Sequence, residues 1–268
     1  MKKVLTIAGS DCSGGAGIQA DLKTFSAHGT FGMSVVTSVV AENTFRVADI
    51  QDVRVDIIEK QLICIFEDIV PDAIKIGMLG SKEIMQTVAK FLKEHKEEAK
   101  NIVIDPVMYA KNGCALMDIE NINTLIAQII PLADVLTPNI PEAEHIASMK
   151  IENEEDVKNA CIKIHKMGCK SVLIKGGHSN GDEACDILYD GKEFYKYCTK
   201  KIDTKNTHGT GCTYSSAIAA NLALGKPIFE ALEISKEYIT NAIKYSLEIG
   251  KGHGPTNHFY KFFKNQGE

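Results

Sequence analysis

Short apolar runs that end in a polar residue or glycine recur along this chain, and they are the strongest constraint on its fold. The runs span residues 4–9, 73–77, 102–106, 133–139 and 171–177. Nearly continuous apolarity is typical of a strand buried on both faces, and such strands belong to parallel sheets. Helical patterns lie between the runs, in residues 18–25, 81–98 and 154–167. Gly29 and Gly168 are placed to end the first and last of these helices. This alternation predicts an α/β fold with a doubly wound sheet.

Two segments do not follow this alternation of strand and helix patterns. Residues 34–41 are rich in β-branched side chains and predict a further strand. Residues 182–197 alternate aromatic and polar side chains around Asp190-Gly191, which predicts a hairpin with an Asp-Gly turn. We find no linker, low-complexity segment or internal repeat, so we expect residues 1–268 to form a single domain.

Composition excludes several classes of protein. With 268 residues and 44% hydrophobic side chains, the chain can bury a sizeable core and is not intrinsically disordered. Its net charge of -5 lacks the basic character of a nucleic-acid binder. Apolar runs are too short for a membrane span or a secretory leader. We therefore expect a cytoplasmic protein without nucleic-acid or membrane partners.

Eight cysteines are scattered along the chain, at positions 12, 64, 114, 161, 169, 185, 198 and 212. They form no Cys-x-x-Cys pair and show no regular spacing. In a long chain without a secretory leader, this pattern indicates reduced thiols that pack as small apolar residues. We expect one exception, Cys212, because of the loop in which it lies.

A glycine-rich turn follows the first apolar run, in residues 9–17. Glycines at such a turn allow a ligand or another part of the backbone to approach closely. The spacing matches neither the P-loop nor the dinucleotide-binding pattern. A tight strand-to-helix turn without a ligand explains this segment equally well.

Residues 206–213 carry the strongest local signal, because a second glycine-rich loop here leads directly into a helical pattern. Backbone N–H groups at a helix N-terminus form a cradle for anions, and the helix dipole adds to their effect. The same placement lowers the pKa of a thiol, which makes Cys212 a candidate for reactivity. The alternative is an ordinary helix start with small residues for close packing.

Polar residues at other predicted strand ends point to the same chemistry. Asn139 and Glu142 offer an amide and a carboxylate suited to a hydrated magnesium ion, and Asp105 could add to that set. Lys175 could contact phosphate oxygens. Each residue also has an ordinary explanation, as a helix start, a turn residue before proline or a solvated strand end. Together they supply the cation, carboxylates and anion cradle that phosphoryl transfer requires.

Motifs in a specific order run along nearly the whole chain. They span residues 7–11, 13–21, 41–44, 75–79, 105–108, 136–139, 207–213 and 252–258. In this order they resemble the hydroxymethylpyrimidine/phosphomethylpyrimidine kinases of thiamine biosynthesis, a family of the ribokinase-like superfamily. The resemblance implies a three-layer αβα fold, with a central, mostly parallel sheet and helices on both faces. It also implies ATP as co-substrate, Mg²⁺ as cofactor and a homodimer.

The resemblance carries roles over to individual residues. The catalytic loop that holds the transferring phosphate matches Gly209, Thr210, Gly211 and Cys212. Many ribokinase-like enzymes have an aspartate base where this branch, like this chain, has cysteine. Residues that match the substrate pocket are Glu42, which would bind the aminopyrimidine, and Ala16, Val40, Met78 and Val107. ATP contacts match Lys175 and Asn139, and magnesium contacts match Glu142 and Asp105. Residues 109–114 match a segment that covers the site in relatives, and we assign no catalytic role to Cys114.

The function that the resemblance implies is phosphorylation of 4-amino-5-hydroxymethyl-2-methylpyrimidine and then of its monophosphate. A pyridoxal kinase of the same cysteine-bearing branch is the main alternative, and Glu42 and Met78 favour the pyrimidine. A sugar or nucleoside kinase fits less well, because aspartate is missing at the base position. A distant alternative is a vitamin-binding protein without activity. The chain ends soon after the last motif, so we expect no fused thiamine-phosphate synthase module.

Overall fold

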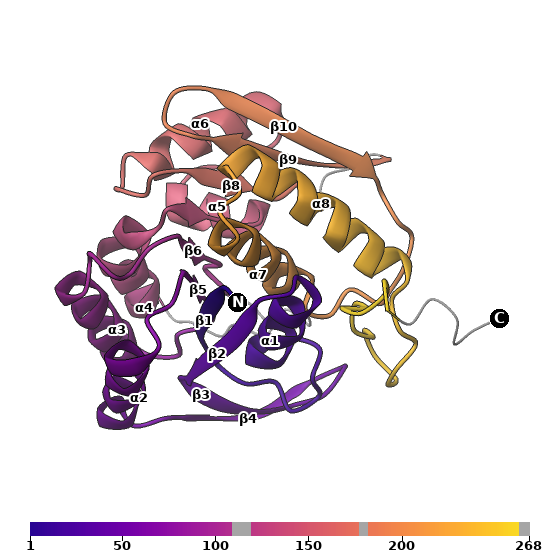
Figure 1. The fold of residues 1–268 in the computed structure, drawn as a ribbon. Helices are drawn as coiled ribbons and strands as arrows, with labels where there is room; N and C mark the ends of the chain where they lie inside the picture. Colours follow the sequence, from indigo (N-terminus) through magenta and orange to yellow (C-terminus); the bar gives the residue numbers. More distant parts are fainter. Residues whose placement is uncertain (109–118, 177–181, 263–268) are drawn as a thin grey trace.

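A mostly parallel sheet forms the centre of the fold in the computed structural model, which describes residues 1–108, 119–176 and 182–262 (Figure 1). Its strand order is β10-β9-β8-β7-β6-β5-β1-β2. The bounds are β1 (Lys3–Ala8), β2 (Phe31–Val36), β5 (Ala73–Ile76), β6 (Ile102–Ile104), β7 (Val135–Leu136), β8 (Val172–Ile174), β9 (Glu183–Tyr189) and β10 (Phe194–Lys200). Along the sheet, each pair of neighbouring strands from β2 through β1, β5, β6 and β7 to β8 is parallel. The pairs β8–β9 and β9–β10 are antiparallel.

Helices cover both faces of this sheet (Figure 1). On one face pack α1 (Gly17–Ala27), α7 (Thr210–Ala223) and α8 (Ile228–Lys244). The opposite face carries α2 (Val55–Asp68), α3 (Lys82–Glu94), α5 (Ile140–Ala147) and α6 (Glu154–His165). Between α3 and α5 lie α4 (Ile119–Thr124), the π-helical turn Leu125–Ile129 and the 3₁₀ turn Ile130–Leu132. The structure confirms the predicted three-layer αβα fold.

Alternating side chains divide the core into two layers. Leu5 and Ile7 of β1 belong to the cluster beneath α2 and α3, whereas Val4 belongs to the cluster beneath α7 and α8. All three are fully buried. Successive residues of a strand point to opposite faces, so a strand buried on both faces must be apolar throughout. This explains the continuous apolar runs of the sequence.

Two expectations about strands need correction. Residues 34–41 do not form one strand, because β2 ends at Val36 and β3 (Ser38–Glu42) belongs to a separate sheet with β4 (Val47–Asp52). The backbone of Thr37 joins the two sheets, since its N–H donates to Ala8 (3.0 Å) and its carbonyl accepts from Val53 (2.9 Å). The apolar run at 133–139 contributes only two residues to the sheet, in β7.

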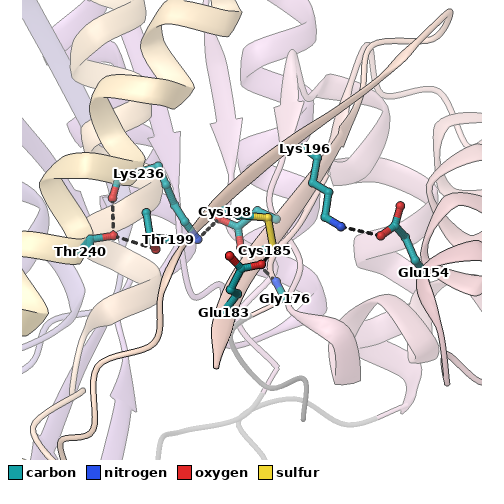
Figure 2. The surroundings of a disulfide bond; sticks show 10 residues. Glu154, Gly176, Glu183, Cys185, Lys196, Cys198, Thr199, Lys236 and Thr240 are labelled. Atoms are coloured by element: carbon teal, nitrogen blue, oxygen red, sulfur yellow. Dashed lines mark hydrogen bonds and ion pairs between the residues drawn. A yellow bond between two sulfur atoms is a disulfide. The ribbon is translucent and has the colours of Figure 1, made fainter. Parts of the chain in front are cut away.

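The predicted hairpin is confirmed as β9 and β10, with Gly191 of the Asp-Gly turn at a φ of 92°. It also corrects the expectation of reduced thiols, because Cys185 and Cys198 form a disulfide (Figure 2). These residues are directly opposite each other in the antiparallel pair, with Cα atoms 4.1 Å apart. Such short cross-strand distances bring two side chains into contact, and the hairpin register therefore creates the pair.

Candidate active site

Residues that follow the carboxyl ends of the parallel strands converge on the first turn of α7. A methyl group added at Gly211 would lie 3.1 Å from Asp105 Oδ2 and 3.5 Å from Lys175 Nζ. Lys175 Nζ lies 2.8 Å from Asp105 Oδ1, and both side chains are largely buried. Burial alone would lower the pKa of Lys175, but Asp105 and Glu142 raise it above its ordinary value. The site therefore holds a cation at the N-terminal end of a helix, where anions bind favourably.

The turn before α7 depends on close backbone packing. Gly209, at the N-cap position, has a φ of 75°. A methyl group at Gly209 would collide with the carbonyl oxygen of Gly15, so the two glycine-rich loops of the sequence lie against each other. Thr210 Oγ1 donates to the Thr207 carbonyl (2.8 Å) and tightens the turn. The loop thus needs glycine at position 209 for its conformation as well as for the close approach of the Gly15 backbone.

Asp11 organises the first glycine-rich loop and ties it to the second. This fully buried carboxylate accepts hydrogen bonds from the N–H groups of Ser13, Gly15 and Ala16 (2.7–2.9 Å). Its Oδ2 also lies 2.8 Å from Nε2 of His208. Burial would raise the pKa of Asp11, but the hydrogen bonds, led by that of His208, hold it well below its usual range. Asp11 belongs to the motif at residues 7–11, and its sequence position alone did not indicate this separate role.

Lys75 is a second buried cation that the sequence analysis did not assign. Its Nζ lies 2.9 Å from Asp21 Oδ2, and neither side chain is exposed. Burial alone would lower the pKa of Lys75, but Asp21, Cys212 and Asp105 raise it. A lysine inside the otherwise apolar strand β5 was the signal in the sequence, because a lysine there must have a buried partner.

Cys212 lies beside these charges in the first turn of α7, and the expectation of a lowered pKa is wrong. Burial raises the pKa of the Cys212 thiol to about 11, and Lys75 offsets this only in part. Desolvation disfavours the thiolate more than the neighbouring lysine favours it. The cysteine is free, and it is positioned by the loop as the sequence predicted.

Asn139 and Glu142 form the start of α5 and also border the charged cluster. The Asn139 side chain accepts from the Glu142 N–H (2.9 Å), and the Glu142 carboxylate accepts from the Asn139 N–H (2.8 Å). This is a capping box, so the ordinary interpretation as a helix start is correct. The pKa of Glu142 is raised, mainly by burial. Asp105 raises it further, and Lys175 partly offsets the increase. The helix start therefore places the Glu142 carboxylate beside the cluster.

Two of the expected substrate-pocket residues, Glu42 and Met78, lie beside the first glycine-rich loop. One carboxyl oxygen of Glu42 lies within 4.8 Å of a carboxyl oxygen of Asp11 and of a ring nitrogen of His208. Burial and Asp11 raise the pKa of Glu42 to about 7, although His208 lowers it. Met78 lies over Gly9, since a methyl group there would be 2.6 Å from its Cε atom.

The remaining expected pocket residues lie in adjacent segments. Ala16 donates its N–H to Asp11 (2.7 Å), and Val40, buried in β3, donates its N–H to Ser10 Oγ (3.3 Å). Val107 follows Asp105 and donates its N–H to the Asp105 carbonyl (2.9 Å). The predicted site residues thus form two groups, one around Asp11 and one around Lys175, and residues 208–211 contact both. Residues 109–114, which the resemblance places over the site, lie outside the described residues.

Sequence and structure comparisons find close relatives over nearly the whole chain. Residues 11–257 match the family described as phosphomethylpyrimidine kinase. The chain is 46% identical over 268 residues to the hydroxymethylpyrimidine/phosphomethylpyrimidine kinase of Staphylococcus aureus, covering 99% of this chain and 96% of the relative.

Two solved structures are similar as well. A phosphomethylpyrimidine kinase from Clostridium difficile has a TM-score of 0.81 and 49% identity, covering 91% of this chain and 100% of its own. An ADP complex of Bacillus subtilis pyridoxal kinase has a TM-score of 0.89 and 42% identity, covering 96% and 97%.

Proposed function

The chain belongs to the phosphomethylpyrimidine kinase family, and we propose that it phosphorylates 4-amino-5-hydroxymethyl-2-methylpyrimidine with ATP in thiamine biosynthesis. The product, a monophosphate, is the proposed substrate of a second transfer in the same site. The observation that carries this proposal is the convergence of Lys175 and Asp105 on Gly211 at the start of α7. A helix N-terminus with an adjacent cation suits a transferring phosphate group.

The proposed reaction is an in-line attack by the substrate's primary hydroxyl on the γ-phosphorus of ATP. The oxygen–phosphorus bond to the substrate forms as the bond to ADP breaks, and the hydroxyl proton passes to the thiolate form of Cys212. Gly209, Thr210 and Gly211 are proposed to bind the transferring phosphate through their backbone, with Lys175 neutralising its charge. Most of the rate acceleration then comes from positioning and charge stabilisation.

Cys212 has a minor part in this scheme. A thiol whose pKa is raised to about 11 is mostly protonated near neutral pH, so only the small thiolate fraction can accept the proton. In a loose transition state the proton leaves late, so the base supplies only part of the rate acceleration. We expect Cys212→Ala to lose substantial but not all activity.

Asp105 and Glu142 are the proposed contacts of a magnesium ion that accompanies ATP. Their carboxylates lie in one charged cluster with Lys175, and carboxylate oxygens are ligands that Mg²⁺ prefers. The ion would neutralise phosphate charge, whereas Lys175 and Asn139 would contact the nucleotide. Removing the Glu142 carboxylate with Glu142→Gln should therefore impair use of MgATP.

Contacts with the substrate ring determine whether the enzyme prefers the pyrimidine or pyridoxal. We propose that Glu42 binds the aminopyrimidine and that Ala16, Val40, Met78 and Val107 line the pocket. Pyridoxal is the second candidate, because a pyridoxal kinase of 42% identity has the same fold. The two rings share a hydroxymethyl group and differ in their other substituents, so they are separated by contacts such as that of Glu42.

An ATP-consumption assay with purified protein tests the proposal on three substrates: the pyrimidine, its monophosphate and pyridoxal. We expect the highest kcat/KM with the pyrimidine and its monophosphate, and a wide preference for pyridoxal would overturn the proposal. The same assay on Cys212→Ala and Glu142→Gln tests the residue roles. An unimpaired Cys212→Ala enzyme would refute the proton-acceptor role, and an unchanged KM and kcat for MgATP in Glu142→Gln would refute the magnesium role.

We further propose a single domain, a homodimer and a cytoplasmic location, where ATP is available. Among the described helices, none is long and apolar enough to cross a membrane. Sedimentation of the purified chain tests the dimer.

A further inference from the structure

The motif at 252–258 has no role in the proposed reaction, yet it lies between the two loops of the site. It belongs to a segment that follows α8, drawn in yellow in Figure 1, and we call residues 250–258 the C-terminal strap. One end of the strap contacts the turn between β3 and β4, residues 43–46, which we call the pyrimidine loop because Glu42 precedes it. The other end contacts residues 206–213, the phosphate loop.

Thr44 is the point at which the strap holds the pyrimidine loop. The Gly252 N–H donates to Thr44 Oγ1 (3.0 Å), and the His253 N–H donates to the Thr44 carbonyl (2.9 Å). A methyl group on Gly252 would collide with the Thr44 carbonyl, and one on Gly250 would lie 2.5 Å from the Thr44 side chain. Gly250 also has a φ of 84°. The glycines are therefore required for this close approach.

Beside the close contact at Thr44, the pyrimidine loop and the strap are not densely packed. A cavity of about 320 Å³ lies next to this contact, bordered by Ser13, residues 43–45, residues 249–251 and Pro255. Side chains that line this cavity make few dispersion contacts across it, so packing there does little to fix the pyrimidine loop. Bonds within the turn set its own shape, since the N–H groups of Phe45 and Arg46 donate to Asn43 Oδ1 (3.1 Å each), whereas the two bonds at Thr44 join it to the strap.

The same strap is bonded to the phosphate loop. The His208 N–H donates to the Gly254 carbonyl (3.0 Å), and the Gly254 N–H donates to Asn206 Oδ1 (3.1 Å). His258 Nε2 lies 3.0 Å from Thr213 Oγ1, in the turn of α7 that contains Cys212. Burial lowers the pKa of His258 to about 4, so it is neutral near pH 7. The strap therefore connects the two loops through backbone and buried side-chain bonds.

We propose that the C-terminal strap is a positioning element that fixes the pyrimidine loop relative to the phosphate loop, with Thr44 and Gly252 as positioning residues. The proposal rests on the proposed function, in which Glu42 binds the ring and residues 209–212 bind the transferring phosphate. Thr44 follows Glu42 by two residues, so a shift of Thr44 displaces Glu42. Binding of the ring substrate should then suffer more than binding of ATP.

Thr44→Val tests this directly, because valine keeps the shape of threonine and removes the hydroxyl. We expect KM for the ring substrate to rise about three- to tenfold, the effect of losing one hydrogen bond. KM for ATP should change by less than about twofold, within the ordinary effect of a surface substitution. Thr44→Ser retains the hydroxyl and should restore the wild-type KM. Thr87→Val, on the exposed side of α3, is the matched control.

A double-mutant cycle tests whether Thr44 and Gly252 act through one contact. Gly252→Ala should also raise KM for the ring substrate, and the double variant Thr44→Val/Gly252→Ala should be no worse than about the larger single effect. Additive effects would overturn the pairing. Gly252→Ala also provides a second test if Thr44→Val does not fold, as judged by its melting temperature.

The proposal fails if Thr44→Val leaves KM for the ring substrate unchanged, or if KM for the ring and for ATP rise equally. Failure of the proposed function has a different signature, because the wild-type enzyme would then prefer pyridoxal. In that case the strap is tested with pyridoxal as the ring substrate. A selective rise in its KM would support the strap while refuting the pyrimidine assignment.

Discussion

Replacing Lys75 with methionine tests whether a buried ion pair stabilises the base of the site. Lys75 Nζ lies 2.9 Å from Asp21 Oδ2, and neither side chain has exposed surface. Asp21 also accepts hydrogen bonds from Thr6 Oγ1 (2.6 Å) and Ser216 Oγ (2.7 Å). The ion pair joins β5 to α1, and the two hydroxyl bonds add β1 and α7, so Asp21 connects the elements next to both glycine-rich loops.

The size of the effect follows from this environment. Methionine approximates the volume of lysine and removes the charge, so the variant leaves the Asp21 carboxylate buried with its two hydroxyl donors. Breaking a buried ion pair costs about 3–5 kcal/mol. The remaining donors place the expected loss in the free energy of unfolding near the lower end, about 3 kcal/mol. The melting temperature should fall by about 6–12 °C, at about 2–4 °C per kcal/mol for a chain near this size.

Urea unfolding and thermal melting at pH 7 measure this loss. The double variant Lys75→Met/Asp21→Asn is the matched control, because it also removes the unpaired carboxylate and should recover part of the stability. A Lys75→Met protein within about 1 kcal/mol of wild type, the range of an exposed ion pair, would refute the reasoning. So would a double variant less stable than Lys75→Met, since the cost would then not come from an unpaired charge.

Two further predictions concern pH and the disulfide. Burial and Asp11 raise the pKa of Glu42 to about 7, above its ordinary value of 4.5, so its contribution to stability is full below pH 4.5 and is lost as the pH rises through 7. Glu42→Gln should therefore increase the melting temperature relative to wild type more at pH 8 than at pH 5, and an equal difference at both would contradict this. Cys198→Ser should lose up to about 3 kcal/mol of stability under non-reducing conditions, because the disulfide closes a loop between residues 13 apart. Cys64→Ser, an exposed free cysteine, is the control. Equal thiol titrations of the denatured protein before and after reduction would show that the disulfide is absent.

The strands of the central sheet were predictable because a strand buried on both faces must be apolar at nearly every position, and this pattern is visible within a short segment. The runs at 4–9 and 73–77 coincide with β1 (Lys3–Ala8) and β5 (Ala73–Ile76) to within one residue at each end. The segment 34–41 was not predictable in this way. Thr37 breaks it by hydrogen bonding to Ala8 and Met78, residues far along the chain. A local pattern contains no information about such partners.

The placement of the site was also partly predictable. Lys175 and Asp105 were candidates because the carboxyl ends of parallel strands share one edge of the sheet, and they do meet there. The role of Lys75 was missed, because its partner Asp21 is 54 residues away. The pKa of Cys212 was predicted in the wrong direction, because burial outweighs the effect of its position on the helix.

The order of apolar runs and glycine-rich turns determined the fold and the edge of the sheet where the site forms, since each signal depends on residues close together in sequence. Pairings across the chain were decided by packing: Asp11 with His208, Lys75 with Asp21, Cys185 with Cys198, and Thr44 with Gly252. Each pair requires two segments to meet at hydrogen-bond or covalent distance, and these distances depend on strand register and helix placement. Burial, which sets the pKa of Cys212 and Glu42, likewise exists only once the layers are assembled.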